Sequence, residues 1–459
     1  MRVSHNVSAR FDDPNLVSCA GLAPVLSLAE RCGLHDLVAE RLTVSGAGGA
    51  NAEVKVPALV AGMVAGADCI DDLDLLRHGG MERLCNGVRA PSTLGTFLRS
   101  FRFGHVRQLD AVAARLLANL TAHTPLLAGV DQVAFVDIDD TVKQTHGYAK
   151  QGAGYGYSGV QGLNALIGTC STPTSAPVIA ATRLRKGSTN SARGAARLVA
   201  DALATTKAAG ATGLVIVRMD SAFYNADVIA AVGRAGARFS VTARMDPAVR
   251  ASICSIADDA WTPIRYPNAI FDDDEQRWVS DAEVAEIDHT AFTSRRQVDH
   301  VVGRLIVRRV KRLNPVSAGA EQTELFSAYR YHAVFTDSPL QMLPAESCHR
   351  GHAVIEQVIA DLKASALAHL PSGKFSANAA WLVCAAIAFN LTRAAGCLAS
   401  TFHSRATTTT IRTQLITIPA RLARSARRLV LHLPRDWPWK TAWQDLFTLT
   451  CGPPAAAPH

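Results

Sequence analysis

Residues 135–141 read Phe-Val-Asp-Ile-Asp-Asp-Thr, and this stretch decides how the rest of the chain is interpreted. It has the composition of a β-strand. Because side chains two residues apart on a strand share a face, Asp137 and Asp139 are expected side by side. Carboxylates on a strand rich in Val, Ile and Phe are costly unless they bind a cation or pair with a base. The stretch therefore predicts a functional cluster of acids on a buried strand.

Two further carboxylates complete the predicted cluster. Residues 213–220, Gly-Leu-Val-Ile-Val-Arg-Met-Asp, read as a second buried strand that ends on Asp220. Residues 349–363 have the apolar spacing of an amphipathic helix and carry Glu356. Two strand aspartates and a helical glutamate predict a divalent-metal site for phosphoryl chemistry on DNA. Three ordinary salt-bridged acids are the alternative.

The composition is that of a globular protein. Of the 459 residues, 48% are hydrophobic and 19% charged, and the net charge of +8 fits either a nucleic-acid partner or a solvated basic surface. The ten cysteines include no Cys-x-x-Cys pair, which argues for a reducing cytoplasm. The N-terminus lacks an apolar signal core, and the apolar residues 379–389 are too few to cross a bilayer. We expect a cytoplasmic, nucleoid-associated protein without membrane contact.

Residues 1–125 are expected to form an N-terminal helical domain, because apolar residues recur there at helical spacing. Residues 90–102 open with Pro and hydroxyl caps and continue into a helix with Arg99 and Arg102. This helix could dock on DNA phosphates in the manner of a helix-turn-helix. A plain helical bundle with solvated arginines is the alternative.

Residues 126–245 are expected to fold in the order strand, strand, strand, helix, strand, helix, strand. With one acid on the first strand and another at the end of the fourth, this order is the layout of an RNase H-like fold. The predicted fold class is therefore α/β, a mixed sheet flanked by helices. The Gly/Tyr-rich residues 151–159 lack the spacing of a dinucleotide fingerprint and are expected to form a loop near the site or a hairpin tip.

An antiparallel β insertion over residues 246–340 is expected to interrupt this core, before helices in residues 341–400 complete it. Residues 301–312 and 329–336 alternate as strands do. The first of them predicts an exposed basic ribbon suited to a phosphate backbone, or else a charged edge strand that prevents aggregation. The basic residues of this ribbon are Arg304, Arg308, Arg309, Lys311 and Arg312.

Residues 401–459 are expected to form a basic C-terminal tail. The spacing of Arg421, Arg424, Arg427 and Arg428 places their positive groups on one side of a predicted helix. Tryptophans are interleaved with basic residues farther along the same tail. The tail could therefore bind DNA, or the helix could lie on the surface anchored by the tryptophans.

With these residues in place, the chain resembles the DDE insertion-sequence transposases, and among them the branch with a β-rich insertion before the glutamate, insertion-sequence family thirteen-eighty. The resemblance covers nearly the whole chain and is most specific at residues 137–141, at residues 218–224 and at Glu356 with Lys363. The first acid of the family lies in an Asp-x-Thr motif, which matches Asp139, with Asp137 and Asp140 as alternatives. The 136 residues between the second and third acids fit an inserted domain.

The family has a helix signature, Tyr-x-x-Arg-x-x-x-Glu followed by Lys seven residues later. Glu356 and Lys363 keep this spacing, whereas His349 and His352 stand where Tyr and Arg would be. Residues 352, 356 and 363 would share a helix face, and Arg350 could replace some of the missing charge. The predicted DNA-binding residues are Lys363, Arg350, His352, His349, Arg308, Arg309, Lys311 and Arg312.

The resemblance implies cut-and-paste transposition, with binding of terminal inverted repeats, cleavage and strand transfer to a target DNA by a homodimer in a synaptic complex. Asp139, Asp220 and Glu356 are the predicted catalytic residues and would hold two Mg²⁺ ions, or Mn²⁺ in their place, with Asp139 shared between them. In related enzymes an aromatic residue of the insertion holds a flipped base at a DNA hairpin. Trp278 is the candidate here, with simple packing as the alternative.

Two other classes of protein compete with this interpretation. A glycosidase or other metal hydrolase also uses paired carboxylates, but the basic ribbon and the lack of an aromatic sugar platform count against it. A non-catalytic, domesticated transposase would keep the fold and bind DNA sequence-specifically without cleaving it. The presence of all three acids favours the active enzyme.

Overall fold

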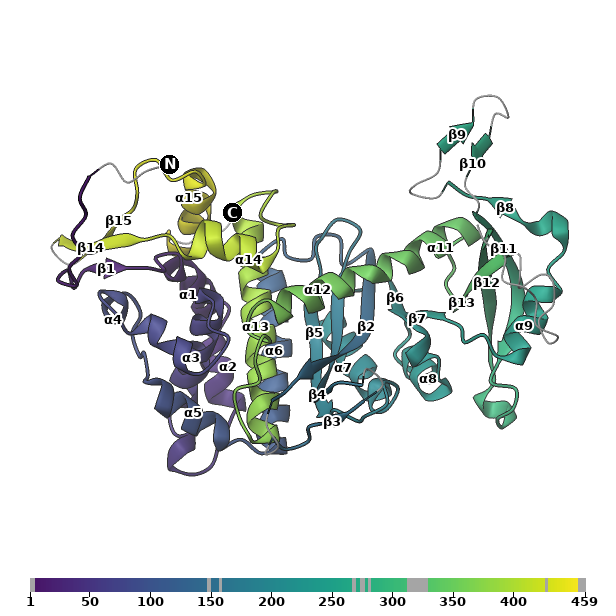
Figure 1. Cartoon of the computed structure of the whole chain (residues 1–459), viewed down its shortest axis with the longest axis horizontal. Helices are drawn as coiled ribbons and strands as arrows, with labels where there is room; N and C mark the ends of the chain where they lie inside the picture. Colours follow the sequence, from purple (N-terminus) through teal and green to yellow (C-terminus); the bar gives the residue numbers. More distant parts are fainter. Residues whose placement is uncertain are drawn as a thin grey trace, which may run out of the picture. The chain divides into compact units, whose positions relative to one another are not determined.

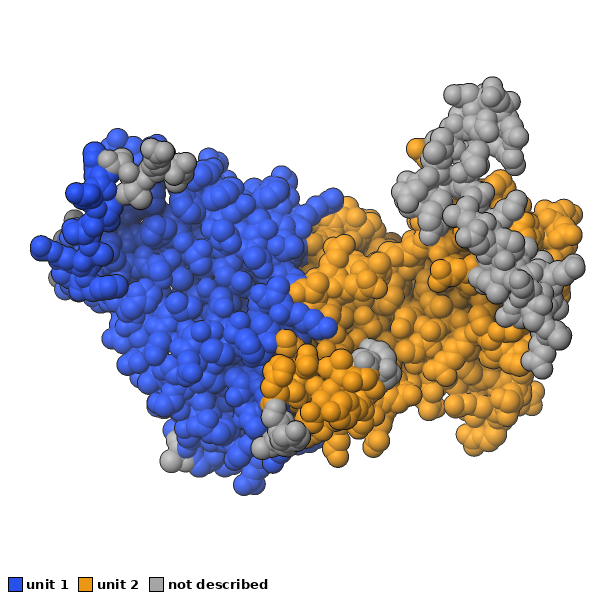
Figure 2. Space-filling view, viewed as in Figure 1, with its two compact units in different colours: residues 1–126, 147–151, 361–459 blue, residues 127–146, 152–360 orange. Residues whose placement is uncertain are grey.

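The chain divides into two compact units (Figure 2). Unit 1 comprises residues 1–126, 147–151 and 361–459, and unit 2 comprises residues 127–146 and 152–360. Both ends of the chain therefore belong to unit 1, and the middle of the chain forms unit 2. The computed structural model describes residues 5–146, 150–156, 159–265, 270–272, 277–279, 282–311, 329–425 and 428–452.

A ten-stranded mixed sheet is the framework of unit 2 (Figure 1). The strands follow the order β3-β4-β2-β6-β7-β13-β12-β11-β8, and β5 pairs with β4. The strands β2, β6 and β7 run parallel, whereas β4 is antiparallel to β2, and β5 to β4. Their bounds are β2 (Val133–Gln144), β3 (Gly154–Tyr155), β4 (Gln161–Ser171), β5 (Val178–Lys186), β6 (Leu214–Met219) and β7 (Arg238–Thr242).

Two helices pack on this part of the sheet and on each other. The helix α7 (Ala195–Ala208) covers β2, β4 and β5, and α8 (Ala226–Arg234) packs on β7. The residues of α7 that recur at helical spacing, Leu198 and Ala202, are fully buried, as expected for an amphipathic helix on a sheet. The predicted mixed sheet flanked by helices is therefore confirmed, and the predicted order of strands and helices is found with one addition, the two-residue strand β3.

The strands after β7 extend the same sheet rather than forming a separate one. The strand β13 (Tyr329–Thr336) pairs antiparallel with β7, followed by β12 (Val301–Lys311), β11 (Ala282–Ala291) and β8 (Thr262–Pro263). The helix α11 (Met342–Arg350) contacts β11 and β12, and its Ala345 joins their core of aliphatic side chains. A short helix, α9 (Pro247–Cys254), follows β7 in the sequence, and the short strands β9 (Ile270–Asp272) and β10 (Arg277–Val279) pair with each other.

The segment that carries Glu356 is not the single helix that its apolar spacing predicted. The helix α11 ends at Arg350, a 3-10 turn occupies Gly351–Ala353, and α12 (Val354–Lys363) follows. Arg218 lies at this interruption, where its Nη1 donates to the carbonyl of Cys348 at 2.9 Å. A Cβ at Gly351 would lie 2.5 Å from the same Nη1. The Arg218 guanidinium therefore contacts the end of α11, and a side chain at residue 351 would have to displace it.

Unit 1 is built around the helix α13 (Phe375–Ala399), which contains the predicted buried helix. It is long and apolar enough to cross a membrane by length and composition, but 89% of its most apolar window is buried, as in the core helix of a soluble protein. It packs against α1, α3, α5, α6, α14 and α15. The helices of unit 1 are α1 (Leu22–Arg31), α2 (Leu34–Arg41), α3 (Ala52–Ala65), α4 (Met81–Leu84), α5 (Pro91–Arg99), α6 (Phe103–His123), α14 (Thr408–Ile411) and α15 (Lys440–Cys451).

The arginine-rich part of the C-terminal tail forms strands, so the prediction of a helix there is wrong. The strands β14 (Ala420–Ser425) and β15 (Arg428–His432) pair antiparallel, and β14 also pairs with β1 (Leu16–Val17). Leu422 is buried while its neighbour Arg421 is exposed, which is the alternation of a strand with one face covered. Arg427 lies outside the described residues.

Candidate active site

Asp139 and Asp220 are neighbours because of the parallel register of β2 and β6. This register pairs Ile138 with Met219, and the residues that follow these two in the sequence are Asp139 and Asp220. Asp220 directly follows β6, and Asp139 lies in β2 just beyond the stretch that pairs with β6, so both lie where the parallel pairing ends. Ligands of α/β proteins bind at this end of parallel strands. The sequence predicted both acids, and the strand register explains why they meet.

The other two acids of the first strand are already neutralised. Asp137 is fully buried and forms a bidentate ion pair with Arg218, with both N–O distances 2.7 Å. The Arg218 guanidinium also lies 4.4 Å from the centre of the Phe135 ring. Asp140 is ion-paired with Arg185 and accepts a hydrogen bond of 2.9 Å from Asn164 Nδ2. Both carboxylates therefore have a cationic partner from the chain itself.

Asp139 differs from its two neighbours on the strand. It forms no ion pair with any residue that the structure describes, and its Oδ1 accepts the backbone N–H of Asp140 at 2.7 Å. Burial raises the pKa of Asp139 to about 6; the charges of Asp220 and Asp140 add to the rise, and the Asp140 N–H and His352 oppose it. Burial also raises the pKa of Asp220. Two adjacent, buried carboxylates with raised pKa values favour the binding of a cation.

A pocket of about 450 Å³ opens beside the two aspartates. The Gly/Tyr-rich segment predicted to lie near the site contributes Tyr155 and Gly156 to it. Sequence reasoning missed Arg244 and residues 188–191. The signal for Arg244 was its place after β7, the third parallel strand that ends at this edge. The lining residues are Asp139, Asp140, Tyr155, Gly156, Ser188, Thr189, Asn190, Ser191, Asp220, Ala222 and Arg244.

Glu356 lies in the first turn of α12, where its side chain is exposed and does not line this pocket. Among the described residues, Asp139, Asp220 and Glu356 do not form a group with ligand atoms within 4.8 Å of one another. The turn just before α12 nevertheless reaches the face of the sheet that carries the acids, because His352 Nδ1 lies 3.1 Å from Asp137 Oδ1. The structure therefore brings together two of the three predicted acids and places the third on the element that follows His352.

The basic ribbon of β12 is largely covered, so the prediction of an exposed ribbon is wrong for its described arginines. Arg308 pairs with Glu346 of α11 at 2.7 Å, and its side chain is 12% exposed. Arg309 pairs with Glu283, its cross-strand neighbour on β11, at 2.6 Å. Its guanidinium also lies 4.1 Å from the centre of the Trp261 ring. Acids on adjacent elements have therefore neutralised this charge.

The ribbon also contains Arg304, which pairs with Glu286 at 2.6 Å. The side chain of Lys311 and all of Arg312 lie outside what the structure describes, as does the side chain of Trp278. These three predictions stay predictions.

The remaining predicted DNA-binding residues have different environments. His349 is buried, and its two ring nitrogens lie 2.9 Å from the hydroxyls of Ser240 and Thr242 on β7. Burial lowers the pKa of His349 to about 3, so the ring is neutral. Arg350 pairs with Glu346 at 2.8 Å and is about one-third exposed. Lys363 is the last residue of α12 and is half-buried.

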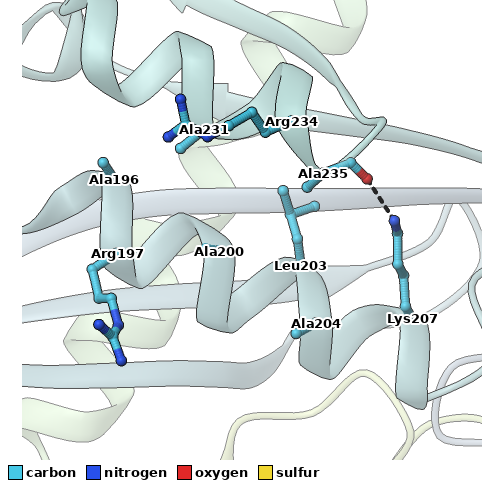
Figure 3. Close-up of a pocket in the computed structure, with 9 residues that line it drawn as sticks. All are labelled: Ala196, Arg197, Ala200, Leu203, Ala204, Lys207, Ala231, Arg234 and Ala235. Carbon is cyan, nitrogen blue, oxygen red and sulfur yellow. Dashed lines mark hydrogen bonds between the residues drawn. The ribbon is translucent and has the colours of Figure 1, made fainter.

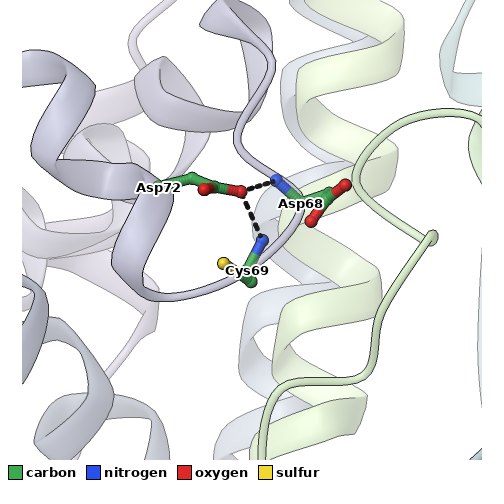
Figure 4. Close-up of side chains that lie close together, drawn as sticks. All are labelled: Asp68, Cys69 and Asp72. Carbon is green, nitrogen blue, oxygen red and sulfur yellow. Dashed lines mark hydrogen bonds between the residues drawn. The ribbon is translucent and has the colours of Figure 1, made fainter.

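Two further places resemble sites but have structural explanations. In unit 1, Asp72 accepts the backbone N–H groups of Asp68 and Cys69 at 3.2 and 3.3 Å, which closes a turn (Figure 4). Burial raises the pKa of the Cys69 thiol, which disfavours metal binding there. In unit 2, an alanine-lined groove lies between α7 and α8, where Lys207 donates to the carbonyl of Ala235 (Figure 3). Its lining contains no carboxylate, hydroxyl or thiol group.

Comparison with protein families gives a match over nearly the whole chain. The family model described as "Transposase DDE domain group 1" matches residues 2–450. The matched range includes the two adjacent aspartates, the pocket beside them and the helix with Glu356. Comparison with curated proteins gives no match.

Proposed function

The chain belongs to the transposase DDE domain group 1 family, and from this membership we propose that it is an active DNA transposase of insertion-sequence family thirteen-eighty. It would cut DNA at terminal inverted repeats and join the freed ends to a target. The observation that carries the proposal is the contrast on β2: Asp137 and Asp140 each have an arginine partner, whereas Asp139 stands beside Asp220 without one. This contrast supports Asp139 as the first acid of the family motif.

A divalent metal fits the residues present. Asp139, Asp220 and Glu356 would supply hard carboxylate oxygens for two Mg²⁺ ions, or for Mn²⁺ in their place. The raised pKa of Asp139 supports this fit, because a cation would relieve the repulsion and the burial penalty that raise it. When bound, the metal activates water or a 3′ hydroxyl and stabilises the charge on the phosphoryl oxygens.

We infer that Arg218 links the strand that carries Asp139 to the segment that leads to Glu356. Arg218 joins β2 through Asp137 and the end of α11 through the Cys348 carbonyl. This anchors the segment that leads into α12 on the face of the sheet with the acids. We assign Arg218 and Asp137 to positioning Glu356, and we assign the buried His349 to fastening α11 to β7 rather than to DNA.

DNA contacts are proposed for the basic residues that follow this anchor. Lys363, Arg350 and His352 would contact phosphates at the transposon end. Arg308 and Arg309 are held by glutamates, so we assign them first to joining β12 to its neighbours. Lys311 and Arg312 remain proposed backbone contacts.

The strand order supports an RNase H-like core. In β5-β4-β2-β6-β7, the strand with Asp139 lies in the centre and the strand before Asp220 lies next to it. We propose residues 126–245 and 341–400 as the two parts of this core, 246–340 as its β-rich insertion and 1–125 as the domain that binds DNA ends. A homodimer in a synaptic complex would pair the two transposon ends.

A non-catalytic, sequence-specific DNA-binding protein is the second candidate. The observation in its favour is that Glu356 is exposed and does not line the pocket of Asp139 and Asp220. Such a protein would retain the fold and the DNA contacts without cleaving the ends.

The test is cleavage of a labelled transposon-end duplex with Mg²⁺, taken from the inverted repeats that flank the coding sequence. Asp139→Ala, Asp220→Ala and Glu356→Ala are expected to abolish cleavage and retain DNA binding. Asp258→Ala removes an exposed acid outside the pocket and serves as the control. Cleavage that persists in the Asp220 or Glu356 variant would move the active site elsewhere. Tight specific binding without cleavage by the wild type would establish the second candidate.

A further inference from the structure

One wall of the pocket, residues 188–191, is held by a buried arginine that the proposed metal chemistry does not use. Arg185 lies near the end of β5 and is 7% exposed. Its Nη1 donates to the carbonyl oxygens of Ser191 and Arg193 at 2.7 and 2.8 Å, and to that of Asn190 at 3.3 Å. The backbone that forms the wall is therefore wrapped around this guanidinium.

Two residues on neighbouring strands hold the same guanidinium. Asp140 of β2 is ion-paired with Nη2 of Arg185, and Asn164 Oδ1 on β4 accepts from its Nε and Nη2 at 3.0 and 2.7 Å. Asn164 is fully buried and Asp140 is 7% exposed, so the ion pair is shielded from solvent. Every nitrogen of the guanidinium thus donates inside the protein, and the charge of Arg185 is not available to DNA.

The wall presents neutral polar groups to the pocket. Ser188 and Asn190 are exposed, Thr189 is half-buried, and all three line the pocket beside the two aspartates. Within the described part of the chain, neither the Ser188 hydroxyl nor the Thr189 hydroxyl forms a hydrogen bond with another residue. Hydroxyl and amide side chains are common donors to the phosphate and sugar oxygens of DNA. The wall therefore has the chemistry to bind a DNA backbone without charge.

We propose that Ser188, Thr189 and Asn190 bind the sugar–phosphate backbone of the DNA strand at the active site, and that Arg185 is the residue that positions them. Arg185 fixes the backbone from which these side chains project. Asp140 serves in positioning the wall through its ion pair with Arg185, rather than in binding metal. The inference rests on the proposed transposase function and deepens it, because it names a substrate contact of the same site.

The wall is tested by removing two hydroxyls from the full chain, with Ser188→Ala and Thr189→Val combined. One neutral hydrogen bond corresponds to about 2- to 13-fold in affinity, so this variant should bind a transposon-end duplex about 5- to 150-fold more weakly, with Ca²⁺ in place of Mg²⁺. No cation is removed, so the slope of log K against log[salt] should keep its wild-type value. Thr293→Val with Ser294→Ala removes two exposed hydroxyls outside the pocket and should match the wild type.

The positioning role is tested with Arg185→Lys, which keeps a cation beside Asp140 but lacks the fork that reaches the wall carbonyls. We expect it to weaken DNA binding as much as the hydroxyl variant does. The two changes combined should weaken binding no further, because both act through the same contacts. Asn164→Ser removes an acceptor of the guanidinium, leaves the ion pair and should show the same non-additivity; it decides the matter if Arg185→Lys does not fold.

Two measurements separate positioning from a purely structural role. Urea unfolding of each variant gives its folded fraction, to which the Kd for DNA is corrected. A residue that only stabilised the fold would lower the unfolding free energy and leave this corrected Kd at the wild-type value. The affinity for Mn²⁺ without DNA should be unchanged in Arg185→Lys, because the variant leaves Asp139 and Asp220 in place.

Cleavage of the transposon end by the wild-type preparation reports separately on the proposed function. If the wild type cleaves, but the hydroxyl variant binds DNA like the wild type, the wall assignment alone is overturned. Wild-type affinity in the folded Arg185→Lys and Asn164→Ser variants, or additive losses when either is combined with the hydroxyl changes, overturns the positioning role. A wild type that neither cleaves nor binds the DNA overturns both proposals.

Discussion

Replacing Asp139 by Asn is expected to stabilise the metal-free protein at neutral pH. Burial and the neighbouring charges of Asp220 and Asp140 raise the pKa of Asp139 from 3.8 to about 6. One pKa unit corresponds to about 1.4 kcal/mol, so the ionised carboxylate destabilises the fold by up to ~3 kcal/mol. Asn removes this charge, and its side-chain oxygen can still accept the Asp140 N–H. Unfolding in urea with a chelator present measures the gain.

The gain in unfolding free energy from Asp139→Asn must depend on pH in a defined direction. Because the pKa of Asp139 is higher in the folded state, the folded protein binds more protons between pH 3.8 and about 6. The penalty is therefore absent below about pH 3.8, grows through this window and is complete above about pH 6. The stability difference between Asp139→Asn and the wild type should follow the same course.

The matched comparison is Asp137→Asn, two residues away on the same strand. It breaks a buried bidentate pair and leaves Arg218 without its carboxylate, so we expect it to destabilise the protein by about 3–5 kcal/mol at pH 7. Two Asp→Asn changes on one strand are thus expected to have opposite signs. Destabilisation by Asp139→Asn at pH 7, or a difference that is constant from pH 4 to pH 7, would refute the reasoning.

Three further outcomes are expected. Mn²⁺ at 100 times its Kd should add ~2.7 kcal/mol to the free energy of unfolding of the wild type and so raise its thermal midpoint. The same Mn²⁺ concentration should raise the midpoint of Asp139→Asn much less. Equal shifts would contradict metal binding at this acid. Glu346→Ala should destabilise by about 3–5 kcal/mol in urea, because it leaves Arg308, 12% exposed, without its carboxylate. Trp381→Ala should destabilise unit 1 by about 3–5 kcal/mol in thermal unfolding, since its buried ring would leave a cavity and its Nε1–H bond to the Ala366 carbonyl would be lost.

Most strands of the central sheet could be predicted from the sequence because they contain apolar runs, whereas the two-residue β3 in the Gly/Tyr-rich segment could not. The distance of 81 residues between Asp137 and Arg218 is also the distance between Asp139 and Asp220. A parallel register that pairs the first two therefore aligns the second two. Sequence reasoning predicted that Asp139 and Asp220 belong to one site, but it could not separate Asp139 from Asp137 and Asp140. That choice depends on which arginines reach them, and Arg185 comes from a different strand.

The exposure of the basic ribbon of β12 also could not be predicted from the sequence alone. The alternation of side chains correctly predicted a strand at residues 301–311, because such alternation reflects local backbone geometry. It does not reveal which side chains of other elements cover the strand. The acids that cover its arginines come from β11 and α11, so their pairing depends on tertiary contacts. In the C-terminal tail, arginines three residues apart suited a helix, but the burial of Leu422 against its strand neighbours decided for a hairpin.

The division of the chain into two units also sets the order in which they can fold during synthesis. The helices α1, α3, α5 and α6 emerge from the ribosome first, yet the helix on which they pack, α13, begins only at Phe375. Every strand of the ten-stranded sheet has been made by Thr336, so unit 2 can assemble while unit 1 still waits for its centre. A nascent chain, or a product truncated before α13, therefore carries N-terminal helices that contact one another but lack the cover of α13, and we expect it to be a substrate for chaperones and proteases.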